Sequence, residues 1–276
     1  MAQRVLTLTG YFFRRLLLSL AGILYILLAL AFWRLFFSPG QGTPDIDYYI
    51  LVIGLFGAGL TFLITLSIAA RGYRALHYPI LARLPSRVEH LTAVMLASLL
   101  YSALLQLLVA LLALFDGPTF SLGQALEIPP IWLSVNLLAA TLALHASDLV
   151  TAGWSRVYVY GLLAVLLFGQ QITSGSTGRL ANIILQVGNW FIRRGWAAAG
   201  NLVNDASRWL NGSGSNLLAQ LFDLVFWPFR AVADAVIAGS FEPLQALAPA
   251  LLVLYATFLF MLAADFFANK DLYLTE

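Results

Sequence analysis

Long apolar runs separated by short polar breaks dominate this sequence. A membrane-spanning helix needs about 20 mainly apolar residues, because the hydrocarbon core is about 30 Å thick and a helix rises about 1.5 Å per residue. Five segments meet this length or nearly so: Leu16 to Phe37, Tyr48 to Ala70, Leu91 to Leu114, Ile131 to Leu149 and Ala248 to Ala268. A sixth, Val157 to Thr173, is shorter. The pattern predicts an all-α membrane protein with six transmembrane helices.

The breaks between the apolar runs contain helix-terminating residues. Ser38 to Gly42 contains one proline and two glycines, which predicts the end of the first span. Pro129 and Pro130 stand directly before the fourth run, and we expect them to open that helix, since proline is tolerated in the first turn.

Other segments are amphipathic instead of uniformly apolar. Residues 1–15 alternate apolar and basic positions at helical spacing, which predicts an interfacial helix along the cytoplasmic leaflet. Residues 174–247 predict an outer-side insertion with helices at 180–195 and 216–238, each with polar residues on one face. We expect both to lie in the membrane interface, because a span would bury Asp223, Arg230 and Asp234. A span by one of them stays open. Ser174 to Gly178 is interpreted as a loop.

Composition agrees with a lipid environment. Apolar residues make up 61% of the 276 residues and charged residues only 10%, whereas about a quarter of an ordinary soluble chain is charged. The chain has no cysteine, and its three histidines are scattered, so no metal site is expected. The net charge of +2 is too small to suggest nucleic-acid binding.

Arginine distribution predicts the orientation. The N-terminal segment and the link between the second and third spans are rich in arginine, whereas the loops 38–47 and 115–130 contain only acidic charges. The positive-inside rule therefore predicts that both termini are cytoplasmic. Arginines in the long 174–247 segment then lie outside, where charge has less influence on topology.

The link between the second and third spans, residues 71–90, contains a distinctive stretch. Leu81-Ala82-Arg83-Leu84-Pro85-Ser86-Arg87-Val88-Glu89 predicts a short cytoplasmic helix, a sharp turn and a new helix. Ser86, followed three residues later by Glu89, is typical of a capping box. This stretch resembles the corresponding link of ABC-2 type transporter permease subunits. The glutamates common at the start of that link are absent here, where Arg71 and Arg74 stand.

The resemblance implies a single permease domain over residues 1–276, in a bacterial plasma membrane and coupled to a separate ATPase subunit. The family uses the link as a coupling helix, so the residues implied in contacting or positioning the ATPase are Arg71, Arg74, Leu84, Pro85, Arg87 and Glu89. ATP and magnesium are expected on that partner, since this chain has no phosphate-binding Gly-x-x-x-x-Gly-Lys-Ser/Thr loop. A second permease copy, identical or related, completes the implied transporter, and export of an amphiphilic, lipid-like or drug-like substrate is expected.

Polar residues inside the spans either pack helices together or line a pathway. Those singled out are Ser98, Ser102, Gln106, Ser134, Thr141, His145 and Asp148. His145 and Asp148 lie one helical turn apart, so two other functions stay open. The chain is a proton-coupled carrier or membrane-embedded enzyme that uses this pair, or it is a structural anchor subunit of a larger membrane complex.

Overall fold

A computed structural model describes residues 2–37, 45–72, 84–115, 118, 121–150, 159–161, 174–211, 213–238 and 242–269. Its described residues form helices without any strand. They divide into two compact units, residues 1–159 with 228–276, and residues 160–227. The predicted all-α class is confirmed.

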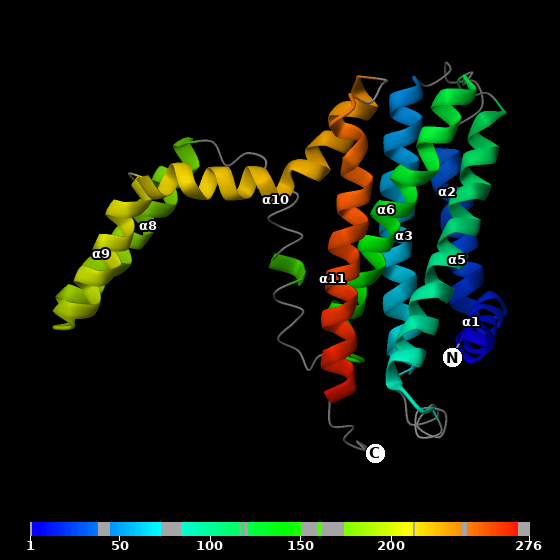
Figure 1. Ribbon diagram of the computed structural model, residues 1–276, viewed down its shortest axis with the longest axis horizontal. Coiled ribbons are helices and arrows are strands. Elements are labelled where there is room, and N and C mark those ends of the chain that lie inside the picture. Colours follow the sequence, from blue (N-terminus) through cyan, green and yellow to red (C-terminus); the bar gives the residue numbers. More distant parts are fainter. Residues whose placement is uncertain are drawn as a thin grey trace. The chain divides into compact units, whose positions relative to one another are not determined.

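The first unit is a helical bundle (Figure 1). It contains α1 (Ala2–Leu17), α2 (Leu20–Phe36), α3 (Ile46–Gly72), α5 (Arg87–Leu114), α6 (Leu122–Ala146) and α11 (Ala248–Asn269). Among the described residues, four helices are long and apolar enough to cross a membrane: α3, α5, part of α6, and α11 with the short η3 (Gln245–Leu247) before it. The pair α1 and α2 would make a fifth span. Several apolar helices are thus able to cross a membrane, as a multi-pass membrane protein requires. The predicted span 157–173 lies outside the described residues except at 159–161.

The N-terminal segment consists of two helices, as its amphipathic and apolar halves predict. The chain bends by 71° between α1 and α2. Ser19 stabilises this bend, since its hydroxyl donates to the Leu16 carbonyl at 2.7 Å and accepts from the Gly22 amide at 3.2 Å. Gly22 lies against the Leu16 carbonyl, so any side chain at position 22 would clash with that oxygen. The Tyr101 hydroxyl of α5 donates to the Gly22 carbonyl at 2.9 Å and joins the bend to the bundle.

The start of α6 differs from the prediction. The helix begins at Leu122, so Pro129 and Pro130 lie inside it instead of opening it. Proline's fixed φ is compatible with a helix; what it removes is an amide donor for the carbonyl four residues earlier. Ala125 and Leu126, whose carbonyls lose those donors, are exposed. The helix also ends at Ala146, three residues before the predicted end of the fourth span.

The second unit consists of α8 (Ser174–Arg193), α9 (Ala197–Asn211) and the first part of α10 (Ser213–Ile237). Helices α8 and α9 run side by side as a hairpin (Figure 1). The expected loop at Ser174 to Gly178 is wrong, because these residues form the first turns of α8. Serine and threonine favour helix starts, where their hydroxyls accept from unpaired amides. Helix α9 was missed, since its polar and small residues give no apolar run.

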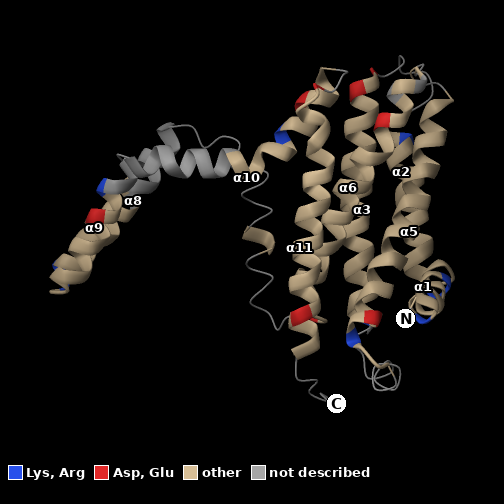
Figure 2. Ribbon diagram, in the orientation of Figure 1, with Lys and Arg blue, Asp and Glu red and all other residues tan. Residues whose placement is uncertain are grey.

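Charged residues of the first unit lie at the two ends of the bundle (Figure 2). One end, here called the terminal end, has the described start of the chain, the last described residues, the end of α3 and the start of α5 (Figure 1). The opposite end has the start of α3, α6 and α11. Helices α6 and α11 therefore run parallel to each other.

Candidate functional site

The link that resembles a coupling segment begins and ends at the terminal end of the bundle. Arg71 lies in the last turn of α3, and α5 starts at Arg87. Arg74 and the rest of 73–83 lie outside the described residues. Leu84 is half-buried, and Pro85 is exposed directly before the start of α5.

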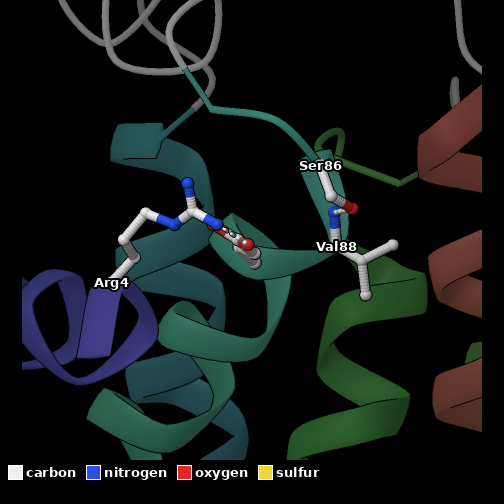
Figure 3. A network of polar contacts seen from close by, with 4 residues as sticks. Arg4, Ser86 and Val88 are labelled. Atoms are coloured by element: carbon white, nitrogen blue, oxygen red, sulfur yellow. Dashed lines mark hydrogen bonds and ion pairs between the residues drawn. The ribbon is translucent and has the colours of Figure 1, made fainter. Parts of the chain in front are cut away.

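The first turn of α5 is capped as predicted, but only by half of the capping box. The Ser86 hydroxyl accepts from the Val88 amide at 3.3 Å (Figure 3). The Glu89 carboxylate does not complete the box. Its Oε1 lies 3.4 Å from the Arg4 guanidinium of α1, and its Oε2 has no hydrogen-bond partner among the described residues. A cation from another helix attracts the carboxylate more strongly than a backbone amide does.

Glu89 and Arg4 differ sharply in exposure. The Glu89 side chain is 3% exposed, whereas that of Arg4 is 53% exposed. A buried carboxylate is costly without a compensating positive charge. Arg4 therefore supplies a counter-charge to Glu89 and joins α1 to the start of α5.

Arg87 contacts the opposite neighbour of α5. Its guanidinium lies 3.5 Å from the Phe267 carbonyl and 3.4 Å from the Ala268 carbonyl, at the end of α11. The last carbonyls of a helix lack intrahelical donors and carry partial negative charge, so an arginine there is stabilising. Arg87, which the family resemblance implies in contact with the ATPase, thus caps the end of α11.

His90 lies fully buried where these three helices meet. Its ring is 5.2 Å from that of Phe12 of α1, in an edge-to-face arrangement, and 6.3 Å from that of Phe267 of α11. Edge-to-face aromatic pairs add to the stabilisation from burial. The start of α5 is therefore joined to both α1 and α11 by charge and by ring packing.

Serines on α5 bind to threonines on α3 across a close helix contact. The Thr65 hydroxyl donates to Ser98 at 2.8 Å, and the Thr61 hydroxyl donates to Ser102 at 2.7 Å. All four side chains are fully buried. Hydroxyl pairs of this kind hold two helices together inside a bilayer, where water does not compete for the bonds.

Gln106 continues this row and joins three helices. Its Nε2 donates to the Ile53 carbonyl of α3 at 3.2 Å, and its Oε1 accepts from Asn136 of α6 at 2.6 Å. Gly57 of α3 faces the same carboxamide, and its lack of a side chain leaves room for it. Asn136 was missed by the sequence reasoning, although a lone amide within an apolar run was a usable signal.

The remaining polar candidates make different contacts. Ser134 and Thr141 donate to carbonyls of their own helix, those of Ile131 and Leu138. The His145 Nε2 lies 2.8 Å from the Leu259 carbonyl of α11. Asp148 lies beyond the end of α6 in an exposed turn, so it does not continue the polar stripe of that helix.

Comparison of the chain with protein-family models, curated proteins and solved structures gives no match. Among the described residues, no group of three or more histidine, aspartate or glutamate side chains is arranged to hold a metal ion. The candidate site, defined by the contacts of the first turn of α5, is the terminal end of the bundle around Leu84 to His90.

Proposed function

We propose that this chain is the transmembrane permease subunit of an ATP-driven transporter and that a separate ATPase subunit docks on the link between α3 and α5. The observation that carries the proposal is the set of contacts at the start of α5. Glu89 binds α1 through Arg4, and Arg87 binds the end of α11. The link enters α5 directly through the exposed Pro85 and the capping Ser86.

These contacts give the link a mechanical role. A displacement of the link by a docked ATPase would move the first turn of α5, and with it the two helices bonded to that turn. Packed helices respond to such a push as rigid bodies that shift between discrete arrangements. Nucleotide-driven closure of the partner would in this way tilt the bundle between inward-open and outward-open forms.

Charge at the ends of the bundle supports a cytoplasmic location of the link. By their places on the helices, five arginines lie toward the terminal end (Arg4, Arg14, Arg15, Arg71 and Arg87) with the acids Glu89, Asp148 and Asp265. The opposite end has mainly acidic residues, among them Asp45, Asp47, Glu127 and Glu242, with Arg34 and Arg230. An excess of arginine marks the cytoplasmic face. An ATPase in the cytoplasm would therefore meet the end from which the link emerges.

The parallel run of α6 and α11 supports an even number of spans. Helix α6 ends at the terminal end and α11 begins at the opposite end (Figure 1). If both helices span a membrane, one further crossing between them is needed to connect them. The apolar run 157–173 is the segment suited to that crossing. Six spans place both chain termini on the same, cytoplasmic, side.

The exposed sides of the bundle support contact with lipid or with a second permease copy. Leu100, Leu104, Leu107 and Leu111 of α5 are all well exposed and follow one another at helical spacing. A second copy, identical or related, would complete a pathway between the two. An amphiphilic cargo fits a pathway bordered by such surfaces.

Co-purification tests the docking proposal. The tagged chain is isolated from its own membranes, and bound proteins carrying a Gly-x-x-x-x-Gly-Lys-Ser/Thr loop are identified by mass spectrometry. We expect an ATPase subunit with the unaltered chain and its loss with Leu84→Asp/Pro85→Ala. The control is Pro243→Ala/Leu244→Asp, an exposed proline and leucine near the start of α11, at the opposite end. Equal recovery with the link variant would contradict the proposal.

A further inference from the structure

The closed end of the α8–α9 hairpin is an ordered turn. The Gly195 amide donates to the Ile192 carbonyl at 3.0 Å, and the Trp196 amide donates to the Phe191 carbonyl at 3.0 Å. Gly195 has a φ of +84°. These two bonds and the left-handed glycine make a Schellman motif, in which a helix ends with its last carbonyls satisfied. Only glycine adopts this backbone conformation without strain.

Aromatic rings hold the same turn together. The rings of Phe191 and Trp196 stack at 5.7 Å with an interplanar angle of 15°, which is the apolar contact that accompanies a Schellman motif. The Trp190 ring packs on Phe191 at 5.1 Å, and the Arg194 guanidinium lies 4.9 Å from the centre of the Trp190 ring. The group formed by Trp190, Phe191, Arg193, Arg194 and Trp196 is here called the hairpin tip.

The hairpin tip is exposed although it is rich in apolar rings. Trp190 is 51% exposed and Trp196 is 65% exposed, and both arginines are exposed. A cluster of exposed aromatic side chains is typical of a surface that binds another protein, a ligand or a membrane. Tryptophan has an apolar body with one polar N–H, so it favours the boundary between lipid tails and headgroups.

The charge of the tip indicates the chemistry of its partner. The sequence has no aspartate or glutamate between Asp148 and Asp205, so Arg193 and Arg194 have no acidic residue near them along the chain. An arginine guanidinium binds phosphate oxygens in a bidentate manner, and its stem adds to apolar contact. An ordered tip with two tryptophans, and with two arginines for which the described residues show no ion pair, fits the headgroup layer of an anionic phospholipid bilayer.

The rest of α9 is unsuited to the same environment. Asp205 and Arg208 form an exposed ion pair at 3.3 Å, and Asn201 is exposed beside them. An ion pair of this kind would be costly to place among lipid tails. We infer that the α8–α9 hairpin contacts an anionic bilayer surface by its tip, with the later part of α9 in water. This inference is independent of ATPase docking.

Spin labels at two alanines of α9 test the inference. The chain contains no cysteine, so Ala198→Cys or Ala206→Cys gives one labelled site in the full-length protein. Both alanines are exposed, Ala198 near the tip and Ala206 about 12 Å further along the helix. Each labelled protein is reconstituted in nanodiscs containing phosphatidylglycerol. Collision rates with oxygen, which concentrates in lipid, and with a water-soluble nickel complex then report depth.

We expect the Ala198 label to collide mainly with oxygen and the Ala206 label mainly with nickel. Phosphatidylcholine alone, or Arg193→Gln/Arg194→Gln in the mixed lipid, should raise nickel collisions at Ala198 several-fold. Equal water exposure of both labels would overturn the inference. So would equal lipid exposure of both, which would mean that the hairpin lies flat, or protection of Ala198 from both reagents, which would mean a protein partner.

Discussion

Gly57 shows how one residue sets the distance between helices. It faces the Gln106 carboxamide, which is held from two other sides by the Ile53 carbonyl and by Asn136. A methyl group at position 57 would overlap the carboxamide, and the carboxamide has no other place to go without losing those bonds. The close approach of α3 and α5 therefore depends on a missing side chain.

Gly57→Ala should lower the free energy of unfolding in detergent by about 1–3 kcal/mol, the usual cost of overpacking. Gly59→Ala is the matched control, since it lies on the same helix and a methyl group there meets nothing. That control should be neutral or stabilising by up to about 1 kcal/mol, because alanine favours helix over glycine. Equal effects of the two substitutions would show that Gln106 is not held as described.

The elements are joined at the terminal end by few but specific contacts. Helix α1 buries Val5, Thr9, Phe12 and Leu16 toward the bundle and leaves Arg14 and Arg15 exposed. The Arg4–Glu89 pair adds a charged contact to this apolar face. Because Glu89 is buried and Arg4 is half exposed, removing the charge of Arg4 should destabilise the protein more than removing the charge of Glu89.

Arg4→Gln should destabilise the protein by about 1–2 kcal/mol, since it leaves a buried carboxylate without a counter-charge. Glu89→Gln should cost less, because no buried charge remains. The double variant should be no less stable than Arg4→Gln alone, and thermal unfolding in detergent measures all three. Arg14→Gln, an exposed control on the same helix, should stay within about 0.5 kcal/mol of the unaltered protein. Additive losses for Arg4 and Glu89 would argue against a direct pair.

The elements were predictable where one physical requirement dominates. Apolar length alone placed α3, α5 and α11 within a few residues, because lipid imposes that length on any span. Helix α9 was missed, since it has no apolar run and its close contact with α8 at Gly188 and Gly200 cannot be read from the local pattern. The start of α6 was predicted wrongly, since proline inside a helix is costly but not forbidden.

The candidate site was predictable only in part. Ser86 was recognisable as a cap from its place before an apolar run. Glu89 binds Arg4, which is 85 residues earlier in the sequence, and Arg87 binds the end of α11, about 180 residues later. The local sequence pattern does not reveal contacts between residues so far apart. The contact of Asn136 could not be predicted for the same reason, since its partner Gln106 is on another helix.

At the scale of the whole molecule, the two ends of the bundle should lie on opposite sides of the membrane. Pro85→Cys at the terminal end should resist a membrane-impermeant thiol reagent in intact cells, whereas Glu242→Cys at the opposite end should react. Both positions are exposed, and the chain has no other cysteine. Reaction of both before lysis, or of Pro85→Cys alone, would contradict the arrangement. Reaction of Pro85→Cys after lysis is the control for accessibility.

The contacts of α11 have a consequence for biosynthesis. Arg87, His90 and His145 are all made long before the helix that they contact, because Leu259 and Phe267 belong to the last helix of the bundle. While the chain is still on the ribosome, Arg87 and His145 thus lack the α11 carbonyls that they contact in the finished bundle, and His90 lacks the Phe267 ring. A chain that stops before Ala248 never acquires those partners, so the contacts of α5 and α6 with α11 form only when synthesis is nearly complete.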